Sequence, residues 1–301
     1  MPLHTDYRPQ EFSEMIGNTA TVKSLESMLQ REDAPHAFLF TGPSGCGKTT
    51  LARLSAKALG CTEQNLTELD SAEFGGVDMV RGLRQRSRLA GLGGGVRCYI
   101  MDECHMLSSQ AQEALLKALE DPPEHVYYFL ATTEPQKLRK TLKNRCTTFE
   151  VQALNDSDMG RLLKWVCTEE KKVLTPDVYN AIINVSEGSP RAALVALDKV
   201  IDLDADEVET ALAQIKTVEA ATIELCRALL KNEKWAKVSR ILKGLKDEEP
   251  ERVRRAVLGY MSAVMLGSNN GRPSIIISEF LDNFYDSGRA GLTLACWNVS
   301  G

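Results

Sequence analysis

The stretch that decides the fold of this chain reads Gly42-Pro43-Ser44-Gly45-Cys46-Gly47-Lys48-Thr49. It fits the pattern G-x-x-x-x-G-K-[ST], the loop that cradles a nucleotide phosphate. The short apolar run 37–40 precedes it, and residues 50–60 follow it with the pattern of a helix. Without the flanking strand and helix, these residues could form a glycine-rich turn that binds nothing. Between a strand and a helix, they predict a phosphate-binding loop.

The chemistry of this loop follows from its residue types. Its glycines let the backbone curl so that successive N–H groups point at phosphate oxygens. The next helix adds unpaired N–H groups and the positive end of its dipole. We expect Lys48 to reach the β- and γ-phosphates and the Thr49 hydroxyl to bind Mg²⁺, with Thr50 beside them. The predicted cofactors are therefore ATP and Mg²⁺.

Composition narrows the class of protein. The chain has 301 residues, 43% hydrophobic and 26% charged, which suits about two soluble domains. A net charge of −5 gives no overall nucleic-acid signature, so any DNA-binding surface must be local. Its eight cysteines form no C-x-x-C pair, which argues against zinc and against a disulfide scaffold.

Location follows from what the sequence lacks. Residues 1–6 do not resemble a signal peptide, and no run of about 18 apolar residues could span a membrane. We expect a soluble protein of a reducing, cytoplasmic compartment without membrane contact, in the host cytoplasm if the source is viral.

Apolar runs of strand length alternate with amphipathic stretches through residue 153. The predicted strands are 37–40, 66–70, 96–101, 126–130 and 147–151, and the predicted helices are 19–30, 77–90, 108–121 and 136–144. This alternation predicts an α/β domain with a five-stranded parallel sheet and helices on both faces. Ligands of such sheets bind at the carboxyl ends of the strands.

Polar residues stand at those strand ends. Asp102 and Glu103 follow the third strand, where the second carboxylate of a phosphate-loop site belongs. We expect Asp102 to hold Mg²⁺, through water, and Glu103 to polarise the attacking water. Thr133 ends the fourth strand and could bind the γ-phosphate or that water. A threonine-rich strand end without function is the alternative.

One predicted helix carries only basic charge on one face. Arg81, Arg84 and Arg88 are spaced i, i+3 and i+7, so they share a face. In an acidic protein, this pattern indicates a surface that contacts the DNA phosphate backbone. A solvated charged face is the plainer alternative.

The remaining residues read as two helical groups. We expect a small helical lid at 154–204, after an ATPase core at 1–153, and an all-helical domain at 205–301. In the lid, Arg191 stands at a helix start after Gly188-Ser189-Pro190. A cation there opposes the helix dipole unless an anion such as ATP lies near. From the residues alone, structural and functional roles for Arg191 stay equally open.

Several motifs occur together in one order: Tyr7-Arg8-Pro9, the phosphate loop, 101–107 (MDECHML), 114–123 (ALLKALEDPP), 130–133 (LATT) and 144–146 (NRC). With them the chain resembles the clamp-loader subunits of the AAA+ ATPases. It is most similar to the bacterial gamma/tau branch and also to the small subunits of replication factor C. The specific motifs cover residues 7 to about 200.

The resemblance implies roles for residues at matching positions. Thr133 matches the sensor of the γ-phosphate, Arg145 the arginine finger that completes a neighbour's site, and Arg191 the second sensor in the lid. The base pocket would be lined by Tyr7, Arg8, Ile16 and Gly17. The arginine helix would face DNA. The all-helical domain at 205–301 would be the collar through which subunits assemble. The implied partners are other loader subunits in a ring of five, a sliding clamp and primer-template DNA.

The chain also departs from the gamma/tau pattern. Gamma/tau subunits carry a cysteine-bound zinc insertion where Cys61 stands alone, so we predict no zinc. Asn144 replaces the serine that usually precedes the finger. No long tail follows residue 301, which would suit a phage or a streamlined replisome. The sequence predicts a subunit that hydrolyses ATP to load a clamp; a non-hydrolysing scaffold subunit, or another AAA+ DNA-remodelling ATPase, is the alternative.

Overall fold

The computed structural model describes residues 2–71, 76–88, 95–203, 205–267, 271–285 and 287–301. The chain divides into two compact units, Met1–Leu203 and Asp204–Gly301. The first unit contains both the predicted nucleotide domain and the predicted lid. No helix in the described ranges is long and apolar enough to cross a membrane.

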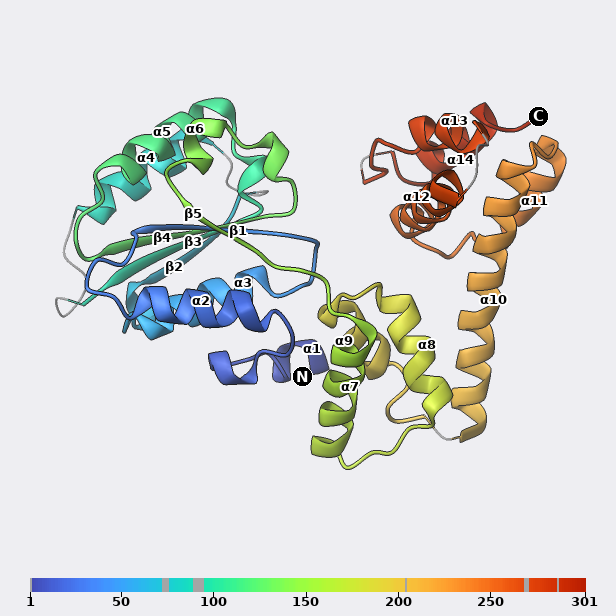
Figure 1. Ribbon diagram of the computed structural model, residues 1–301, viewed down its shortest axis with the longest axis horizontal. Helices are drawn as coiled ribbons and strands as arrows, with labels where there is room; N and C mark the ends of the chain where they lie inside the picture. Colours follow the sequence, from blue (N-terminus) through green and yellow to red (C-terminus); the bar gives the residue numbers. More distant parts are fainter. Residues whose placement is uncertain (1, 72–75, 89–94, 204, 268–270, 286) are drawn as a thin grey trace. The chain divides into compact units, whose positions relative to one another are not determined.

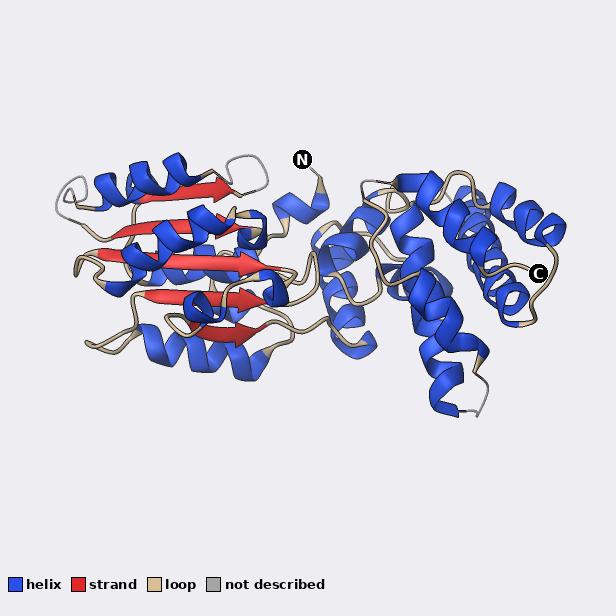
Figure 2. Cartoon of the chain, turned by 90° about the horizontal axis from the view of Figure 1, so that it is seen from above, coloured by secondary structure: helices blue, strands red, loops and turns tan. Residues whose placement is uncertain are grey.

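A five-stranded parallel sheet forms the centre of the first unit (Figure 2). Its strands are β1 (Ala37–Thr41), β2 (Leu66–Asp70), β3 (Arg97–Asp102), β4 (Val126–Thr132) and β5 (Thr147–Glu150). They lie in the order β2-β3-β4-β1-β5, every neighbouring pair parallel. The predicted α/β fold with a five-stranded parallel sheet is therefore confirmed. All five residues of β1 are buried, as expected for an inner strand covered on both faces.

Side chains alternate along each strand, so both faces of the sheet carry apolar side chains. Helices cover both of these faces (Figure 1). Phe38 and Phe40 of β1 pack against α2 (Thr19–Leu29) and α3 (Lys48–Ala58). Leu39, between them, belongs to the opposite layer. That layer contains α4 (Val77–Ser87), α5 (Ser109–Glu120) and α6 (Lys140–Lys143).

Some local expectations need correction. Asn18 directly precedes the predicted helix 19–30, a position at which asparagine favours a helix cap. In the structure it has a left-handed backbone and makes no capping bond to α2. Its side chain instead exchanges two hydrogen bonds with the backbone of Gln152, at 2.9 and 2.8 Å. The predicted helix 136–144 is two short elements, η5 (Pro135–Lys137) and α6. The final residues of the predicted helix 77–90, and most of the glycine-rich loop after it, lie outside the described residues.

Three helices complete the first unit: α7 (Asp156–Glu169), α8 (Pro176–Ser186) and α9 (Pro190–Asp198). Asn155 caps α7 by accepting a hydrogen bond from the Asp158 amide, and Ser189 caps α9 by accepting one from the Ala192 amide. Shorter elements are α1 (Leu3–Asp6), η1 (Phe12–Glu14), η2 (Glu63–Asn65) and η4 (Cys104–Met106).

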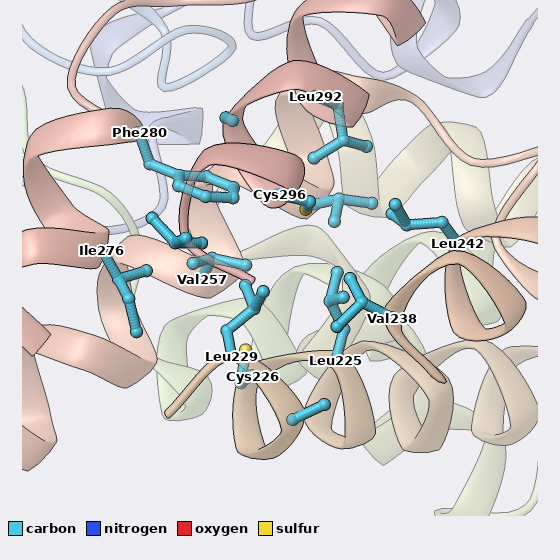
Figure 3. Packing of buried hydrophobic residues seen from close by; sticks show 14 of the residues in the cluster. Leu225, Cys226, Leu229, Val238, Leu242, Val257, Ile276, Phe280, Leu292 and Cys296 are labelled. Carbon is cyan, nitrogen blue, oxygen red and sulfur yellow. The ribbon is translucent and has the colours of Figure 1, made fainter. Parts of the chain in front are cut away.

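The second unit is helical. It comprises α10 (Ala205–Leu230), α11 (Trp235–Gly244), α12 (Pro250–Gly267), α13 (Arg272–Glu279) and α14 (Gly288–Asn298). The sequence pattern predicts separate helices at 207–214 and 220–231. In the structure α10 runs through both without a break, since no glycine or proline interrupts residues 205–230. The core of this unit gathers apolar side chains from all five helices, among them Leu229, Val257 and Phe280 (Figure 3).

A buried carboxylate joins two parts of this unit. Glu251, 3% exposed, accepts hydrogen bonds from Arg254 at 2.6 and 2.8 Å and from the Phe284 amide at 3.0 Å. Burial alone would raise the pKa of Glu251. The bonds from Arg254 and the Phe284 amide, with the charges of Arg254 and Arg255, outweigh burial and lower that pKa. The ionised carboxylate therefore ties α12 to the segment before α14.

Glu251→Ala should destabilise the second unit by about 3 kcal/mol, because it leaves the Arg254 guanidinium buried without its partner. Urea unfolding followed by tryptophan fluorescence measures this effect. Since the folded pKa is lowered, the stabilisation is present at neutral pH and is lost as the pH falls through the carboxyl range. Glu248→Ala is the control: its pair with Arg252 is more exposed, so it should cost less than about 1 kcal/mol. Equal losses for the two variants would contradict the stabilising role of buried Glu251.

Candidate functional site

A cavity opens at the carboxyl ends of the strands, within the first unit. The phosphate loop, the end of β3, the N-terminal segment, α7 and α9 all contribute to its walls. It is lined by the predicted residues Tyr7, Arg8, Ile16, Ser44, Gly45, Cys46, Gly47, Lys48, Thr49, Thr50, Asp102, Glu103 and Arg191. Three other predicted residues, Gly17, Gly42 and Pro43, adjoin this lining in sequence. One cavity thus brings together residues from five separate segments.

Close packing forces the loop to use glycine at two positions. A Cβ on Gly42, at φ +146°, would lie 2.0 Å from the Val151 carbonyl oxygen. A Cβ on Gly45, at φ +71°, would lie 2.3 Å from Ser189 Oγ and 3.2 Å from Arg191 Cβ. The Arg191 amide also donates to the Gly45 carbonyl at 3.4 Å. The loop therefore touches the start of α9 directly.

Lys48 is buried at the base of this loop, with 5% of its surface exposed. Its ammonium donates to the carbonyl oxygens of Gly42 at 2.9 Å and Pro43 at 2.8 Å. Burial lowers the pKa of Lys48, and the nearby carboxylates Glu103 and Asp102 oppose that shift. A buried ammonium between neutral carbonyls and two carboxylates is well suited to bind an anionic phosphate.

Thr49 and Asp102 form the candidate metal site. Thr49 Oγ1 donates to Asp102 Oδ2 at 2.6 Å, which joins the start of α3 to the end of β3. A hydroxyl and a carboxylate oxygen at this separation are ligands that suit Mg²⁺. The residues present therefore fit the predicted metal ion.

Glu103 turns toward the same cavity because its backbone leaves the strand conformation. Its φ of +44° is left-handed, and its amide donates to Asp102 Oδ1 at 3.0 Å. Adjacent side chains on a strand would point to opposite faces, and this turn removes the alternation. Thr133 does not line the cavity. It lies behind Glu103 and donates from Oγ1 to Glu103 Oε2 at 3.0 Å.

The N-terminal segment closes one side of the cavity. The Tyr7 ring packs edge-on against Trp165 of α7, with centroids 5.4 Å apart. The Tyr7 hydroxyl donates to Glu170 Oε1 at 2.6 Å, and this bond, with burial and nearby carboxylates, raises the pKa of Tyr7 to about 12. Gly17 packs against Leu154 and Asp158. These contacts attach residues 7–17 to the helical group that also carries Arg191.

Two sets of predicted residues lie away from the cavity. Arg145 donates to Glu120 Oε1 at 3.2 Å, with half of its side chain exposed. Arg81 and Arg84 lie on α4, and Arg88 follows its last residue. Arg81 and Arg88 are exposed, Arg84 is partly buried, and Arg81 approaches Asp78 at 3.3 Å. Within its own chain, Arg145 therefore completes no part of the cavity.

Sequence reasoning missed several residues of the site. Leu154, Leu162, Trp165 and Leu194 line the cavity, but their apolar spacing only indicates helix cores. His105, inside the 101–107 motif, received no role, although it contacts Glu103. The sequence feature that could have identified His105 as a site residue is its position two residues after Glu103.

Known proteins with similar sequences are bacterial DNA polymerase III subunits. The chain is 34% identical to subunit gamma/tau of Mycobacterium tuberculosis, over 74% of this chain and 43% of that one. It is 35% identical to subunit tau of Bacillus subtilis (70% and 41%) and 36% identical to subunit tau of Escherichia coli (68% and 35%). The chain thus spans less than half the length of these relatives. A family model for the DNA polymerase III delta subunit matches residues 70–155.

Among solved structures, the Holliday junction branch migration motor RuvB of Thermotoga maritima shares the fold. The TM-score is 0.55 at 19% identity, over 93% of this chain and 88% of that one. A RuvB variant gives a TM-score of 0.56 at 20% identity. At this identity, the likeness concerns the fold alone.

The sheet order, the phosphate loop and the following helical domains place this chain in the class of AAA+ folds. AAA+ homology of this kind implies a nucleotide-binding site. Within that class, the sequence similarity decides the branch. The chain is gamma/tau-like: it is similar to the clamp-loader AAA+ subunits of DNA polymerase III at about 34% identity over about 70% of its length.

Gly45→Ala should weaken nucleotide binding at least 10-fold, because its new methyl group must displace Ser189 and the start of α9. Titration with a fluorescent ATP analogue measures the affinity. Gly60→Ala is a matched control: Gly60 has a similar φ of +76°, but a Cβ there meets nothing within 4 Å. Both variants should lose about 1 kcal/mol of stability from the left-handed backbone. Equal nucleotide affinity in the two variants would contradict the proposed contact.

Proposed function

We propose that the chain is an ATP-hydrolysing subunit of a sliding-clamp loader, which opens the clamp and places it on primer-template DNA. The sequence similarity to DNA polymerase III gamma/tau subunits supports this proposal. ATP and Mg²⁺ are the proposed ligands of the cavity. ATP binding would organise the ring around clamp and DNA, and hydrolysis would release the closed clamp.

The observation that carries the proposal is the convergence of a phosphate-binding ammonium and two carboxylates at one cavity. Lys48 is buried beside Asp102 and Glu103, and Asp102 is bonded to the Thr49 hydroxyl. Lys48 would neutralise phosphate charge, and Thr49 and Asp102 would hold Mg²⁺, which would supply further positive charge to the phosphates. Glu103 would accept a proton from the attacking water. Thr133 donates a hydrogen bond to Glu103. It would therefore couple the position of that carboxylate to the presence of the γ-phosphate.

We further propose that each cavity is half of a complete site. Arg145 lies outside its own cavity, with half of its side chain exposed. A neighbouring subunit's Arg145 would supply the missing positive charge, as trans-acting arginine fingers do, for about 10³-fold or more in rate. Arg191, from α9, would contact the nucleotide within the same chain. Five subunits per ring is the expectation from the resemblance.

Arg81 and Arg84 of α4, with Arg88 directly after it, are the proposed DNA contact. Arg81 and Arg88 are accessible on the layer that also contains α5 and α6. Contacts with phosphates would be independent of sequence and would weaken with salt. This matches the recognition of a primer-template junction by shape rather than by base sequence.

The two alternatives differ from this proposal in measurable ways. A non-hydrolysing scaffold subunit would bind nucleotide without turnover, although it would have no need of both Lys48 and Glu103. Another AAA+ DNA-remodelling ATPase would be stimulated by DNA without a clamp. The fold likeness to RuvB does not favour the second alternative, because it rests on 19% identity.

Lys48→Ala should abolish ATP hydrolysis stimulated by clamp and primed DNA, because it removes the buried charge that faces the phosphates. Release of inorganic phosphate measures the turnover. Lys57→Ala is the control, since Lys57 lies on the same helix with an exposed side chain and should leave the rate unchanged. Persistent turnover in the Lys48 variant would sink the proposal, and so would a wild-type rate that primed DNA and clamp never raise.

Arg145→Ala should lower turnover in the assembled loader about 10³-fold and leave ATP binding by the isolated chain unchanged. Arg139→Ala is the matched control, because Arg139 is an exposed arginine nearby that pairs loosely with Glu113 at 3.6 Å. Assembly is followed by native mass spectrometry and binding by titration. If Arg145→Ala weakens ATP binding by the isolated chain as much as it lowers turnover in the assembled loader, Arg145 does not act on a neighbour.

A further inference from the structure

His105 is a buried histidine that lies between two glutamates. It belongs to η4, directly after the Asp102–Glu103 turn, and only 7% of its side chain is exposed. Its Nδ1 lies 3.2 Å from Glu103 Oε2, and its Nε2 lies 3.3 Å from Glu134 Oε1. The ring does not line the cavity, so any effect of His105 on bound nucleotide must act through Glu103.

Two hydrogen bonds from Thr133 and one ring nitrogen of His105 meet at one oxygen of Glu103. Oε2 accepts from Thr133 Oγ1 at 3.0 Å and from the Thr133 amide at 3.3 Å, and it faces His105 Nδ1 at 3.2 Å. Across the described residues, the second carboxylate oxygen, Oε1, has no hydrogen-bond partner. The carboxylate is therefore fixed through Oε2 and keeps Oε1 for a water molecule in the cavity.

The far side of the ring is itself anchored. Glu134 Oε1 accepts from Lys137 Nζ at 2.9 Å, and the Glu134 amide donates to Thr132 Oγ1 at 3.0 Å. Thr132 Oγ1, fully buried, also lies 3.1 Å from His105 Nδ1. Carboxylates only accept hydrogen bonds, so a ring that donates to Glu103 and to Glu134 carries a proton on both nitrogens. The outer carboxylate on Nε2 then orients Nδ1 toward Glu103.

We propose that His105 is a positioning residue, which donates from Nδ1 to Glu103 Oε2 and so holds Oε1 toward the attacking water. This inference rests on the proposed ATP hydrolysis. Glu103 has rotatable side-chain bonds, and Thr133 alone leaves the carboxylate free to pivot about Oε2. The ring removes that freedom, so that Oε1 keeps one direction. His105 thereby acts on turnover and not on nucleotide affinity.

Two amide substitutions separate the two ring nitrogens. The amide nitrogen of His105→Asn can occupy about the place of Nδ1, whereas that of His105→Gln can occupy about the place of Nε2. We expect His105→Asn to keep kcat within about 3-fold of wild type. His105→Gln and His105→Ala should lose about 10-fold or more in kcat, with KM and the affinity for the fluorescent ATP analogue within 2-fold.

A further variant tests the anchor without altering η4. Glu134→Ala removes the outer carboxylate, whose side chain is 30% exposed, and should lower kcat in the same direction by a smaller factor. Thermal unfolding of every variant shows whether the fold is kept. All rates are measured on the full chain in the assembly used for the Lys48 and Arg145 variants.

The outcomes distinguish this inference from the proposed function. Wild-type kcat in His105→Gln and His105→Ala overturns the positioning role while hydrolysis stands. Equal losses in the Asn and Gln variants also overturn it, because they indicate general disruption. A wild-type chain whose turnover equals that of Lys48→Ala overturns the proposed function, and the role of His105 with it.

Discussion

The parallel pairing of β3, β4 and β1 is the constraint on which the rest of the first unit depends. Because these strands run in one direction, their carboxyl ends meet at a single edge of the sheet. The phosphate loop follows β1, the Asp102–Glu103 turn follows β3, and Thr133 follows β4. The cavity is the consequence, since three short connections place their polar groups side by side.

The balance of charge at this edge depends on burial. The Lys48 ammonium is removed from water and stabilised by loop carbonyls and by the charges of Glu103 and Asp102. Electrostatic interactions are stronger in such a site than on the surface, so the ammonium would contribute more free energy to binding a phosphate than an exposed lysine would. Arg145 differs, because its half-exposed ion pair with Glu120 is solvated and contributes little to stability.

Local patterns predicted what depends on local physics. All five strands fall within two residues of their predicted ends, because the strands of this parallel sheet are short runs between polar connections, and the inner ones are mostly apolar. Asn18 and α10 show where such patterns fail. A residue type favoured at helix caps bonds instead to Gln152, which is 134 residues away, and one long helix replaces two predicted ones. Neither outcome is encoded within a short window.

The sequence by itself determined the class of fold and the chemical groups of the site, because the loop spacing and the strand-end residues follow rules of local geometry. Only the tertiary structure decided how those groups are held. It brought Trp165 against Tyr7, Ser189 against Gly45 and His105 between Glu103 and Glu134. These contacts join segments that are close only after folding, since helix packing and backbone turns set which side chains meet.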